Sequence, residues 1–331
     1  MDDHGPDLVP AAGNAQLAAK LRRLAGLASG AAEQSLAPST KASYASDWRD
    51  FSTWTGTHGF TVMPATPQAV ALYLADLAAE AGAAMKTLER RLASISLAHR
   101  SAQLEDPTKA VLVEKTMSGL RRTYGRPQRK AAPITVERVR AMLAVAPPGI
   151  KGTRDRALIL VGLAGGFRRS ELVALEVSHL RHEPQGLRLR VARSKTDQGG
   201  LGEDVGIPYG AHGDTCPVLA LDRWLQEARI SEGRVFRSID RHGNVGESLT
   251  PTSVNLIVKA YAEAAGLTKA LRGEVSPLFT AHSLRAGFAT SAALAGHGER
   301  DIQRHTRHSS TEVLRGYIRD AELYRGGDIG L

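Results

Sequence analysis

A basic stretch broken by glycine and proline divides this chain of 331 residues into two parts. Residues 121–133 read RRTYGRPQRKAAP, and glycine and proline together interrupt a helix there. The length also suggests two domains, because one domain commonly has about 100–200 residues. We therefore expect a loose tail over residues 1–35, a helical domain over 36–124, a basic linker over 125–134 and a second domain over 135–331.

The first part shows helical periodicity in four places. Its first helix, which Ser39 and Thr40 are expected to cap, carries aromatic residues on one side: Tyr44, Trp48 and Phe51. Proline at the first helical position predicts a second helix after Thr66. This helix is expected to bury four apolar residues: Val70, Leu72, Leu74 and Leu77. Residues 86–102 and 108–122 predict two more helices, so the four make a small all-α domain.

The second part is expected to be mostly helical, with a small antiparallel sheet. Residues 187–191 alternate apolar side chains with arginines, and residues 205–208 follow a glycine-rich turn, so the two segments predict a hairpin. Thr135 is expected to cap a short helix. Further helices are predicted over residues 151–163, 217–229, 251–265, 282–294, 301–306 and 310–318. The fold class is therefore mainly α, of the α+β type.

The net charge points to a polyanionic partner. Lys and Arg number 43 against 34 Asp and Glu, which gives a formal charge of +9, and such a surplus favours phosphate contacts through counterion release. A solvated basic face is the alternative; we favour double-stranded DNA, because cations lie on exposed positions of the helical domain. The residues expected to contact DNA are Lys41, Ser43, Lys86, Arg90, Arg121, Arg122, Arg126, Thr252, Asn255 and Lys259.

Composition excludes several other classes. The single cysteine, Cys216, excludes an intramolecular disulfide framework and a multi-cysteine zinc site, and it is expected in the core. The longest strongly apolar run, residues 157–167, is far shorter than the roughly 20 residues that span a bilayer. The first residues lack the basic and apolar regions of a secretory signal. We therefore expect a cytoplasmic protein with no membrane partner.

Two short segments carry arginines suited to bind a phosphate. Residues 165–172 read GGFRRSEL, so a buried helix ends at glycines and presents Arg168 immediately after them. A surface arginine that caps the helix is the alternative for this residue. In the second segment His282 and Arg285 are three positions apart, which places both on one helical face. Both could therefore converge on one anion.

A third segment places a histidine and a tyrosine near the end of the chain. His308 precedes Tyr317 by nine residues in the stretch HSSTEVLRGY. A zinc site of His297, His305 and His308 is an alternative interpretation, but it lacks thiolates and an acidic ligand set. We expect no metal and no other cofactor.

Together the three segments resemble the tyrosine recombinase (phage integrase) family, in which two arginines, a lysine, two histidines and a tyrosine surround a DNA phosphate. GFRRSEL is similar to the first box of the family, HSLR is similar to the second, and the nine-residue interval matches the spacing to the nucleophile. The family keeps its lysine in a hairpin turn, where SKT stands at residues 194–196. The resemblance implies a catalytic set of Arg168, Lys195, His282, Arg285, His308 and Tyr317, with Glu171 behind it. The helical first part resembles the core-binding domain, and within the family the likeness is greatest to recombinases of the Cre type.

This resemblance implies transfer of a DNA strand to Tyr317, for which Tyr324 is the alternative. His282 would assist loss of the phenol proton, because a phenol with pKa near 10 is mostly neutral at pH 7. Lys195 would protonate the departing 5′ oxygen. Two fixed guanidinium groups, those of Arg168 and Arg285, would stabilise the charge of the pentacoordinate phosphorane.

The resemblance also implies the setting of the reaction. His308 would hydrogen-bond a non-bridging oxygen, and Glu171 would orient His282 or its neighbours. The covalent 3′-phosphotyrosine conserves the energy of the cut bond, so joining needs neither ATP nor metal. The implied assembly is a homotetramer on two inverted-repeat DNA sites, monomeric or weakly associated when free, that acts through a Holliday junction.

Three other functions remain open. A type IB topoisomerase shares the phosphotyrosine chemistry but would relax supercoiled DNA that lacks any specific site. A DNA-binding protein without catalysis would bind but form no covalent adduct. A metal-dependent nuclease would lose its activity in excess chelator.

Overall fold

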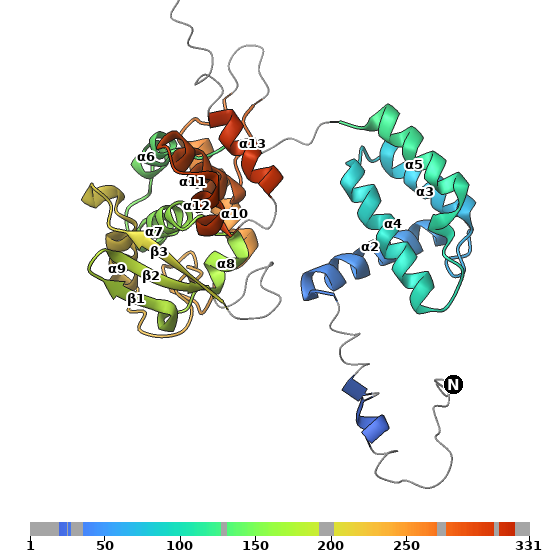
Figure 1. The fold of residues 1–331 in the computed structure, drawn as a ribbon, viewed down its shortest axis with the longest axis horizontal. Helices are drawn as coiled ribbons and strands as arrows, with labels where there is room; N and C mark the ends of the chain where they lie inside the picture. The colour runs from blue at the N-terminus through green and yellow to red at the C-terminus, as the bar shows by residue number, and fades with distance from the viewer. Residues whose placement is uncertain are drawn as a thin grey trace, which may run out of the picture. The chain divides into compact units, whose positions relative to one another are not determined.

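The structure is a computed structural model, and it describes residues 20–24, 26–27, 36–126, 131–191, 202–269, 276–307 and 311–321. It divides into two compact units, Met1–Gln128 and Arg129–Leu331 (Figure 1). Both units are mainly helical and the second also holds a small antiparallel sheet, which confirms the predicted fold class. No helix within the described ranges is long and apolar enough to cross a membrane. Most of the predicted tail, residues 127–130 of the predicted linker, Lys195 and His308 lie outside these ranges.

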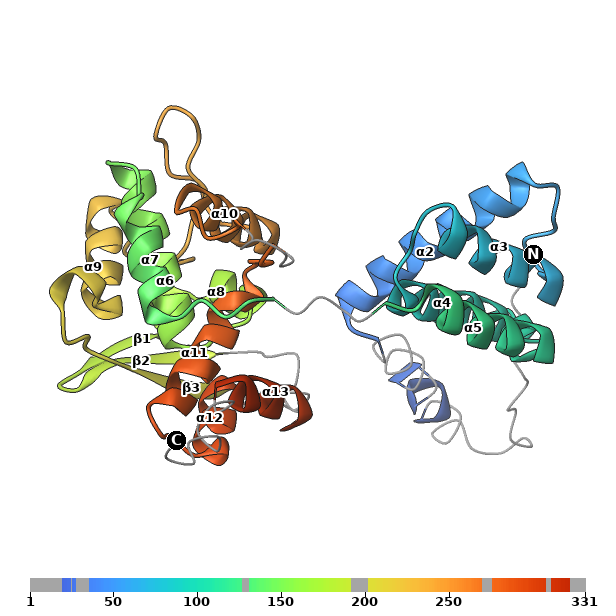
Figure 2. The same cartoon turned by 90° about the horizontal axis from the view of Figure 1, so that it is seen from above.

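Helices that pack on one another make up the first unit between residues 36 and 126. They are α2 (Pro38–Thr57), α3 (Pro67–Ala79), α4 (Met85–Ser101) and α5 (Val111–Tyr124), with a 3-10 turn η1 (Pro107–Lys109) before α5 (Figure 2). The Thr66 hydroxyl accepts a hydrogen bond from the Ala69 amide, so α3 begins as predicted. The apolar sides of the helices meet in a core that contains Phe51, Leu74 and Leu88.

Two details predicted for this unit are wrong. Helix α2 begins at Pro38, before the expected cap of Ser39 and Thr40, because the fixed φ of proline suits the first helical position. Leu72 is 52% exposed, whereas Leu74 is fully buried. On a helix, residues three and four apart share a face, and a residue two positions away points elsewhere.

The second unit consists of helices and one small sheet. They are α6 (Val136–Ala144), α7 (Ile150–Ala164), α8 (Arg169–Ala174), α9 (Pro217–Glu227), α10 (Pro251–Ala264), α11 (His282–Leu294), α12 (Glu299–Thr306) and α13 (Thr311–Ala321), with 3-10 turns η2 (Val177–His179) and η3 (Gly213–Thr215). The helix predicted over residues 282–294 has the bounds observed for α11. Figure 2 shows α11, α12 and α13 lying against one another.

The sheet contains the predicted hairpin and one strand that was not predicted. Strands β1 (Leu180–Glu183), β2 (Gly186–Val191) and β3 (Glu203–Pro208) pair antiparallel in that order. In the hairpin, Leu187 lies opposite Ile207 and Leu189 lies opposite Val205, and all four are buried. The sequence of β1, LRHE, lacks the alternation of apolar and polar residues that identifies a half-buried strand, and none of its residues is buried in the structure.

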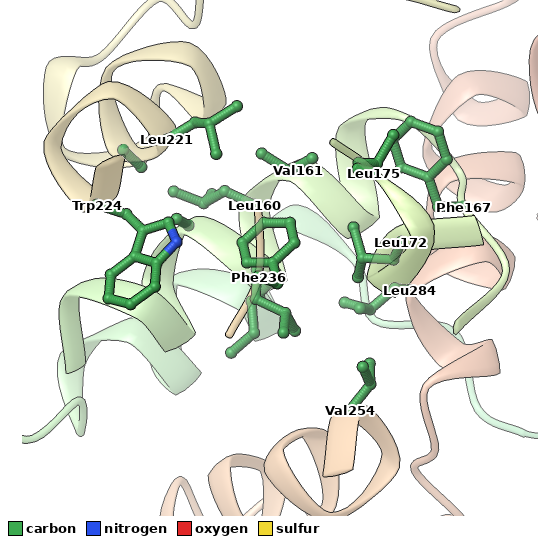
Figure 3. Close-up of a cluster of buried hydrophobic side chains, with 14 of the residues drawn as sticks. Leu160, Val161, Phe167, Leu172, Leu175, Leu221, Trp224, Phe236, Val254 and Leu284 are labelled. Atoms are coloured by element: carbon green, nitrogen blue, oxygen red, sulfur yellow. The ribbon is translucent and has the colours of Figure 1, made fainter. Parts of the chain in front are cut away.

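The core of the second unit lies around α7, whose residues 157–161 are all buried. Figure 3 shows Leu160 and Val161 of α7 with Trp224 of α9 on one side and Leu172 of α8 on the other, and Leu284 of α11 beside α8. Full burial of such an aliphatic side chain contributes roughly 1.5–3 kcal/mol to the stability of the fold. This packing fixes α8 and α11 around the end of α7.

The last residues of the predicted linker, 132–134, are hydrogen-bonded to the rest of the second unit. The Ala132 amide donates to the Leu278 carbonyl at 2.8 Å, and the Ile134 amide donates to the Ser283 carbonyl at 2.9 Å. Ile134 is fully buried in the core of the second unit. A Cβ atom at Gly287 of α11 would lie 2.0 Å from the Ile134 carbonyl oxygen, so only glycine allows this close approach.

Candidate active site

The candidate site is built at the C-terminal end of α7. Gly166, just after the helix, has a φ of +55°, a left-handed conformation that glycine adopts without the steric cost of a Cβ atom. Three successive carbonyl oxygens there accept hydrogen bonds: Ala164 from His305 Nε2 at 2.9 Å, Gly165 from Arg307 Nη2 at 3.4 Å and Gly166 from Arg285 Nη1 at 2.8 Å. Cations are favoured at this position because a helix carries partial negative charge at its C-terminus. The end of α7 therefore holds Arg285 in place.

Arg168 and Glu171 form the second component of the site. The Glu171 carboxylate accepts hydrogen bonds from the Arg168 amide at 3.0 Å and from Arg168 Nη1 at 2.5 Å. Burial by itself would raise the pKa of Glu171, but the charge of Arg307 and the hydrogen bonds from Arg168 lower it below its ordinary value. Glu171 therefore stays ionised and holds the Arg168 side chain, which is 21% exposed.

Helix α11 supplies the second arginine. The residue before the helix is fixed from α10, because the Ala281 amide donates to Asn255 Oδ1 at 3.0 Å. Arg285 points inward and is 1% exposed. Burial, followed by the positive charge of Arg168, lowers the pKa of Arg285 to about 9, which leaves the guanidinium protonated at neutral pH. The guanidinium groups of Arg168 and Arg285 are thus close enough to act on one another, an arrangement suited to bind one anion from two sides.

Tyr317 faces His282 across the contact between α13 and α11. The Tyr317 hydroxyl lies 3.0 Å from His282 Nε2, and the tyrosine is 7% exposed. His282 as a whole residue is exposed. Partial burial of its imidazole, followed by the charges of Arg285 and Arg168, lowers the pKa of His282 below its ordinary value of 6.5. A neutral imidazole can accept a proton, so the pair is arranged for proton transfer from the phenol.

Four of the six predicted catalytic residues therefore meet in one place. Arg168 and Arg285 lie close enough to His282 to influence its protonation, and Tyr317 in turn acts electrostatically on Arg285. The other two predicted residues lie outside the described part of the chain. The residues that meet can together hold an anion beside a phenol and a proton acceptor.

One histidine of the zinc alternative, His305, has other partners. The His305 ring stacks on Phe288 with centroids 4.2 Å apart and 12° between the planes, while its Nε2 is bonded to Ala164. Among the described residues, no group of three or more His, Cys, Asp or Glu side chains is placed to hold a metal ion. Cys216 is buried, as expected for a core residue.

The ten candidate DNA contacts differ in their surroundings. Four have protein partners: Arg90 with Asp47 at 2.6 Å, Arg121 with Glu89 at 2.9 Å, Ser43 with the Ser39 carbonyl at 2.9 Å, and Asn255 with the Ala281 amide. The other six residues are all exposed: Lys41, Lys86, Arg122, Arg126, Thr252 and Lys259. Asn255 holds the start of α11, a role that its sequence position did not indicate.

Sequence reasoning missed Arg307, which contacts both Glu171 and the end of α7. One signal could have found it. Arg307 directly follows the predicted helix of residues 301–306, at a position where glycine commonly ends a helix. A charged residue in such a turn indicates a side chain with specific partners.

Comparisons with known proteins agree on one family. The model of the phage integrase family matches residues 133–323. The chain is 40% identical over 298 residues to an integrase/recombinase XerD homolog of Selenomonas ruminantium, an alignment that covers 88% of this chain and 85% of that protein. It is 30% identical over 298 residues to the tyrosine recombinase XerD of Bifidobacterium longum, with 86% and 88% covered.

Solved structures show the same fold. A lambda integrase dimer bound to a COC′ core site superposes with a TM-score of 0.61 at 17% identity, over 94% of this chain and 82% of that chain. The XerH site-specific recombinase in a post-cleavage complex with palindromic difH substrate gives 0.57 at 19% identity, over 80% and 72%.

Proposed function

Because the chain belongs to the phage integrase family of tyrosine recombinases, we propose that it cleaves and rejoins DNA at specific sites through a covalent 3′-phosphotyrosine intermediate. The observation that carries this proposal is the 3.0 Å approach of the Tyr317 hydroxyl to His282 Nε2, beside two arginines. A nucleophile, a proton acceptor and two phosphate-binding cations are the parts that such a reaction needs.

In the proposed cleavage step, Tyr317 attacks the scissile phosphorus. A bond forms between the phenolic oxygen and phosphorus, the bond from phosphorus to the 5′ oxygen breaks, and the phenol proton passes to His282 Nε2. Arg168 and Arg285 stabilise the negative charge that develops on the non-bridging oxygens, and their fixed positions avoid reorganisation during the step. The low pKa of His282 supports its role as acceptor.

Two further roles are proposed from the family resemblance. Lys195 gives the departing 5′ oxygen its proton, and His308 hydrogen-bonds a non-bridging oxygen. A 5′-hydroxyl from a partner duplex then attacks the phosphotyrosine, which releases Tyr317 and joins the strands without ATP. Two such exchanges pass through a Holliday junction, and we propose that a homotetramer on two sites performs them. The likeness to the Cre type also stays a prediction.

Double-stranded DNA is the proposed partner. The XerH and lambda integrase structures that share this fold are bound to DNA, and the XerH substrate is palindromic, which supports an inverted-repeat site. The net charge of +9 favours phosphate contacts. We propose that the other six candidate residues, all of them exposed, make these contacts from both units: Lys41, Lys86, Arg122, Arg126, Thr252 and Lys259.

The decisive experiment is a covalent-adduct assay on DNA selected from a random pool by binding to the full chain. Tyr317→Phe is expected to abolish the adduct while DNA binding is retained, because only the attacking oxygen is removed. Tyr324→Phe, which removes the other candidate phenol, is the matched control and is expected to leave the adduct intact. An undiminished adduct with Tyr317→Phe would overturn the assignment.

The same material separates the alternatives. Relaxation of supercoiled DNA that lacks the selected site, without recombinant products, would favour a type IB topoisomerase. Binding without any adduct in the unmodified chain would favour a protein without catalysis. Persistence of cleavage in excess chelator would remove a metal-dependent nuclease.

A further inference from the structure

Arg307 has a backbone conformation that arginine rarely adopts. It follows α12 as the C-cap residue with a φ of +56° and a ψ of +44°, in the left-handed region. Glycine is the usual residue at such a helix end, because a Cβ atom is sterically unfavourable there. An arginine in this conformation indicates side-chain contacts that compensate the cost.

The contacts of Arg307 are those of a charged side chain that is buried in the protein. The Arg307 side chain is 1% exposed, and a cation removed from water needs a charged partner and hydrogen bonds. Its Nη2 lies 3.0 Å from Glu171 Oε2, and its Nη1 donates to the His305 carbonyl at 2.7 Å. Its guanidinium also lies 5.1 Å from the ring centroid of Phe167, a core residue.

Arg307, Glu171 and Arg168 form a closed ring of contacts. One Glu171 oxygen accepts from Arg307 and the other accepts from Arg168, so the carboxylate joins the two guanidinium groups. Arg168 Nη2 then returns to the Arg307 backbone carbonyl at 2.9 Å. The Arg168 guanidinium is therefore held at two nitrogens, once by Glu171 and once by the main chain of Arg307.

The two arginines differ in access to a ligand. The Arg168 side chain is 21% exposed, whereas the Arg307 side chain is buried and both of its terminal nitrogens are bonded to protein oxygens. The contacts of Arg307 reach the partly exposed guanidinium of Arg168 through Glu171 and through the Arg307 main-chain carbonyl.

We propose that Arg307 is a positioning residue, which fixes the Arg168 guanidinium in the orientation that binds the scissile phosphate. This inference rests on the proposed function, because it needs Arg168 to act on a phosphate. Electrostatic stabilisation depends on donors held at the position where charge develops, and the ring holds Arg168 through a residue 139 positions away in the sequence.

The variant Arg307→Gly isolates the side chain. Glycine adopts the left-handed conformation freely and keeps the main-chain carbonyl that Arg168 contacts. Arg307→Lys keeps the charge but loses the planar fork that joins Glu171 to the carbonyl oxygens. Arg223→Ala is the matched control, since it removes an exposed arginine of α9 whose partner is Glu227.

Each full-length variant is tested on the selected duplex for DNA affinity and for the single-turnover rate of adduct formation. We expect Arg307→Gly to slow the reaction on the order of 10²-fold at saturating DNA, with affinity changed by less than about threefold. Arg307→Lys should be intermediate and Arg223→Ala unchanged. A double variant with Glu171→Gln should be no slower than the slower single variant, because both substitutions act through Arg168.

A second substrate separates positioning from a general loss of folded protein. Replacing one non-bridging oxygen of the scissile phosphate by a methyl group removes the charge that Arg168 neutralises, so the gap between wild type and Arg307→Gly should shrink to less than about threefold. An equal gap on both substrates, or an undiminished rate on the ordinary one, overturns the inference alone. If the wild-type chain forms no adduct, the proposed function fails, and the inference falls with it.

Discussion

Replacing Glu171 by glutamine removes one negative charge from between two arginines and keeps nearly the same shape. The carboxylate holds Arg168 Nη1 at 2.5 Å and Arg307 Nη2 at 3.0 Å, and both Glu171 and Arg307 are 1% exposed. Glutamine leaves the Arg307 cation buried without a counter-charge, and its own NH2 group must face a guanidinium. Breaking a buried ion pair in this way costs about 3–5 kcal/mol.

The lower end of that range is expected here. Arg168 is 21% exposed, so water screens part of its attraction to Glu171. We therefore expect the free energy of unfolding of the second unit to fall by about 3 kcal/mol, with a loss of roughly 6–12 °C in its melting temperature. The control is Glu227→Gln, which breaks an exposed pair with Arg223 and should cost no more than about 0.5 kcal/mol.

The assay must report on the second unit alone, because the two units can unfold separately. Hydrogen exchange of α7 peptides, followed by mass spectrometry across a urea series, meets this need. If the free energy of unfolding fell by less than about 1 kcal/mol, Glu171 would not be the counter-charge of the buried Arg307 guanidinium, and the reasoning would be refuted.

The pH dependence gives a second check on the same residue. The pKa of Glu171 is lowered in the folded chain, so its stabilisation is fully present above the unfolded value of about 4.3 and is lost as pH falls through the lower folded value. The stability gap between wild type and Glu171→Gln should therefore be constant from about pH 7 to pH 5 and close only below about pH 4. A gap that already closes at about pH 6 would mean a raised pKa and would contradict the structure.

Three further outcomes follow from the site. Arg168→Ala or Arg285→Ala should slow adduct formation in a single-turnover assay by about 10²-fold or more, as loss of an oxyanion donor does, and ordinary rates would count against both assignments. Because burial and the charges of Arg285 and Arg168 lower the pKa of His282 from its ordinary 6.5, the acidic inflection of kcat/KM for adduct formation should lie below that value; an inflection above it would exclude His282 as the acceptor. Gly287→Ala places a Cβ 2.0 Å from the Ile134 carbonyl and should destabilise the second unit by about 1–3 kcal/mol in urea unfolding, whereas an unchanged midpoint would show that the backbone moves aside.

Elements with a strong local pattern were predictable from the sequence. Helix α11 has the predicted bounds, and β2 pairs with β3 as the alternation and the intervening turn indicated. Period and turn chemistry act between near neighbours, so they can be read without knowledge of the fold. The weakly patterned β1 was missed for the same reason, and the exposure of Leu72 shows that an unbroken apolar run does not state which face is buried.

The candidate site also contains some residues that could be identified from the sequence and one whose partner could not. The family resemblance placed Arg168, His282, Arg285 and Tyr317 in one candidate site, and the structure brings these four together, while their catalytic roles stay predictions. The place of Arg307 directly after a predicted helix could indicate a side chain with specific partners, but it did not identify Glu171 as the partner. Such a partner is recognised only when burial and distance are known, because a surface arginine and a sealed one have the same sequence.

Local backbone preferences act over a few residues, and these determined where most helices and the hairpin lie. The hydrogen bond from Arg285 to Gly166 joins residues 119 positions apart, and that from Arg307 to Gly165 spans 142. No local preference acts over such separations. Packing of α8 and α11 against α7, and of α12 against α11, decided those contacts, because burial of the apolar side chains of these helices brings them together at the end of α7.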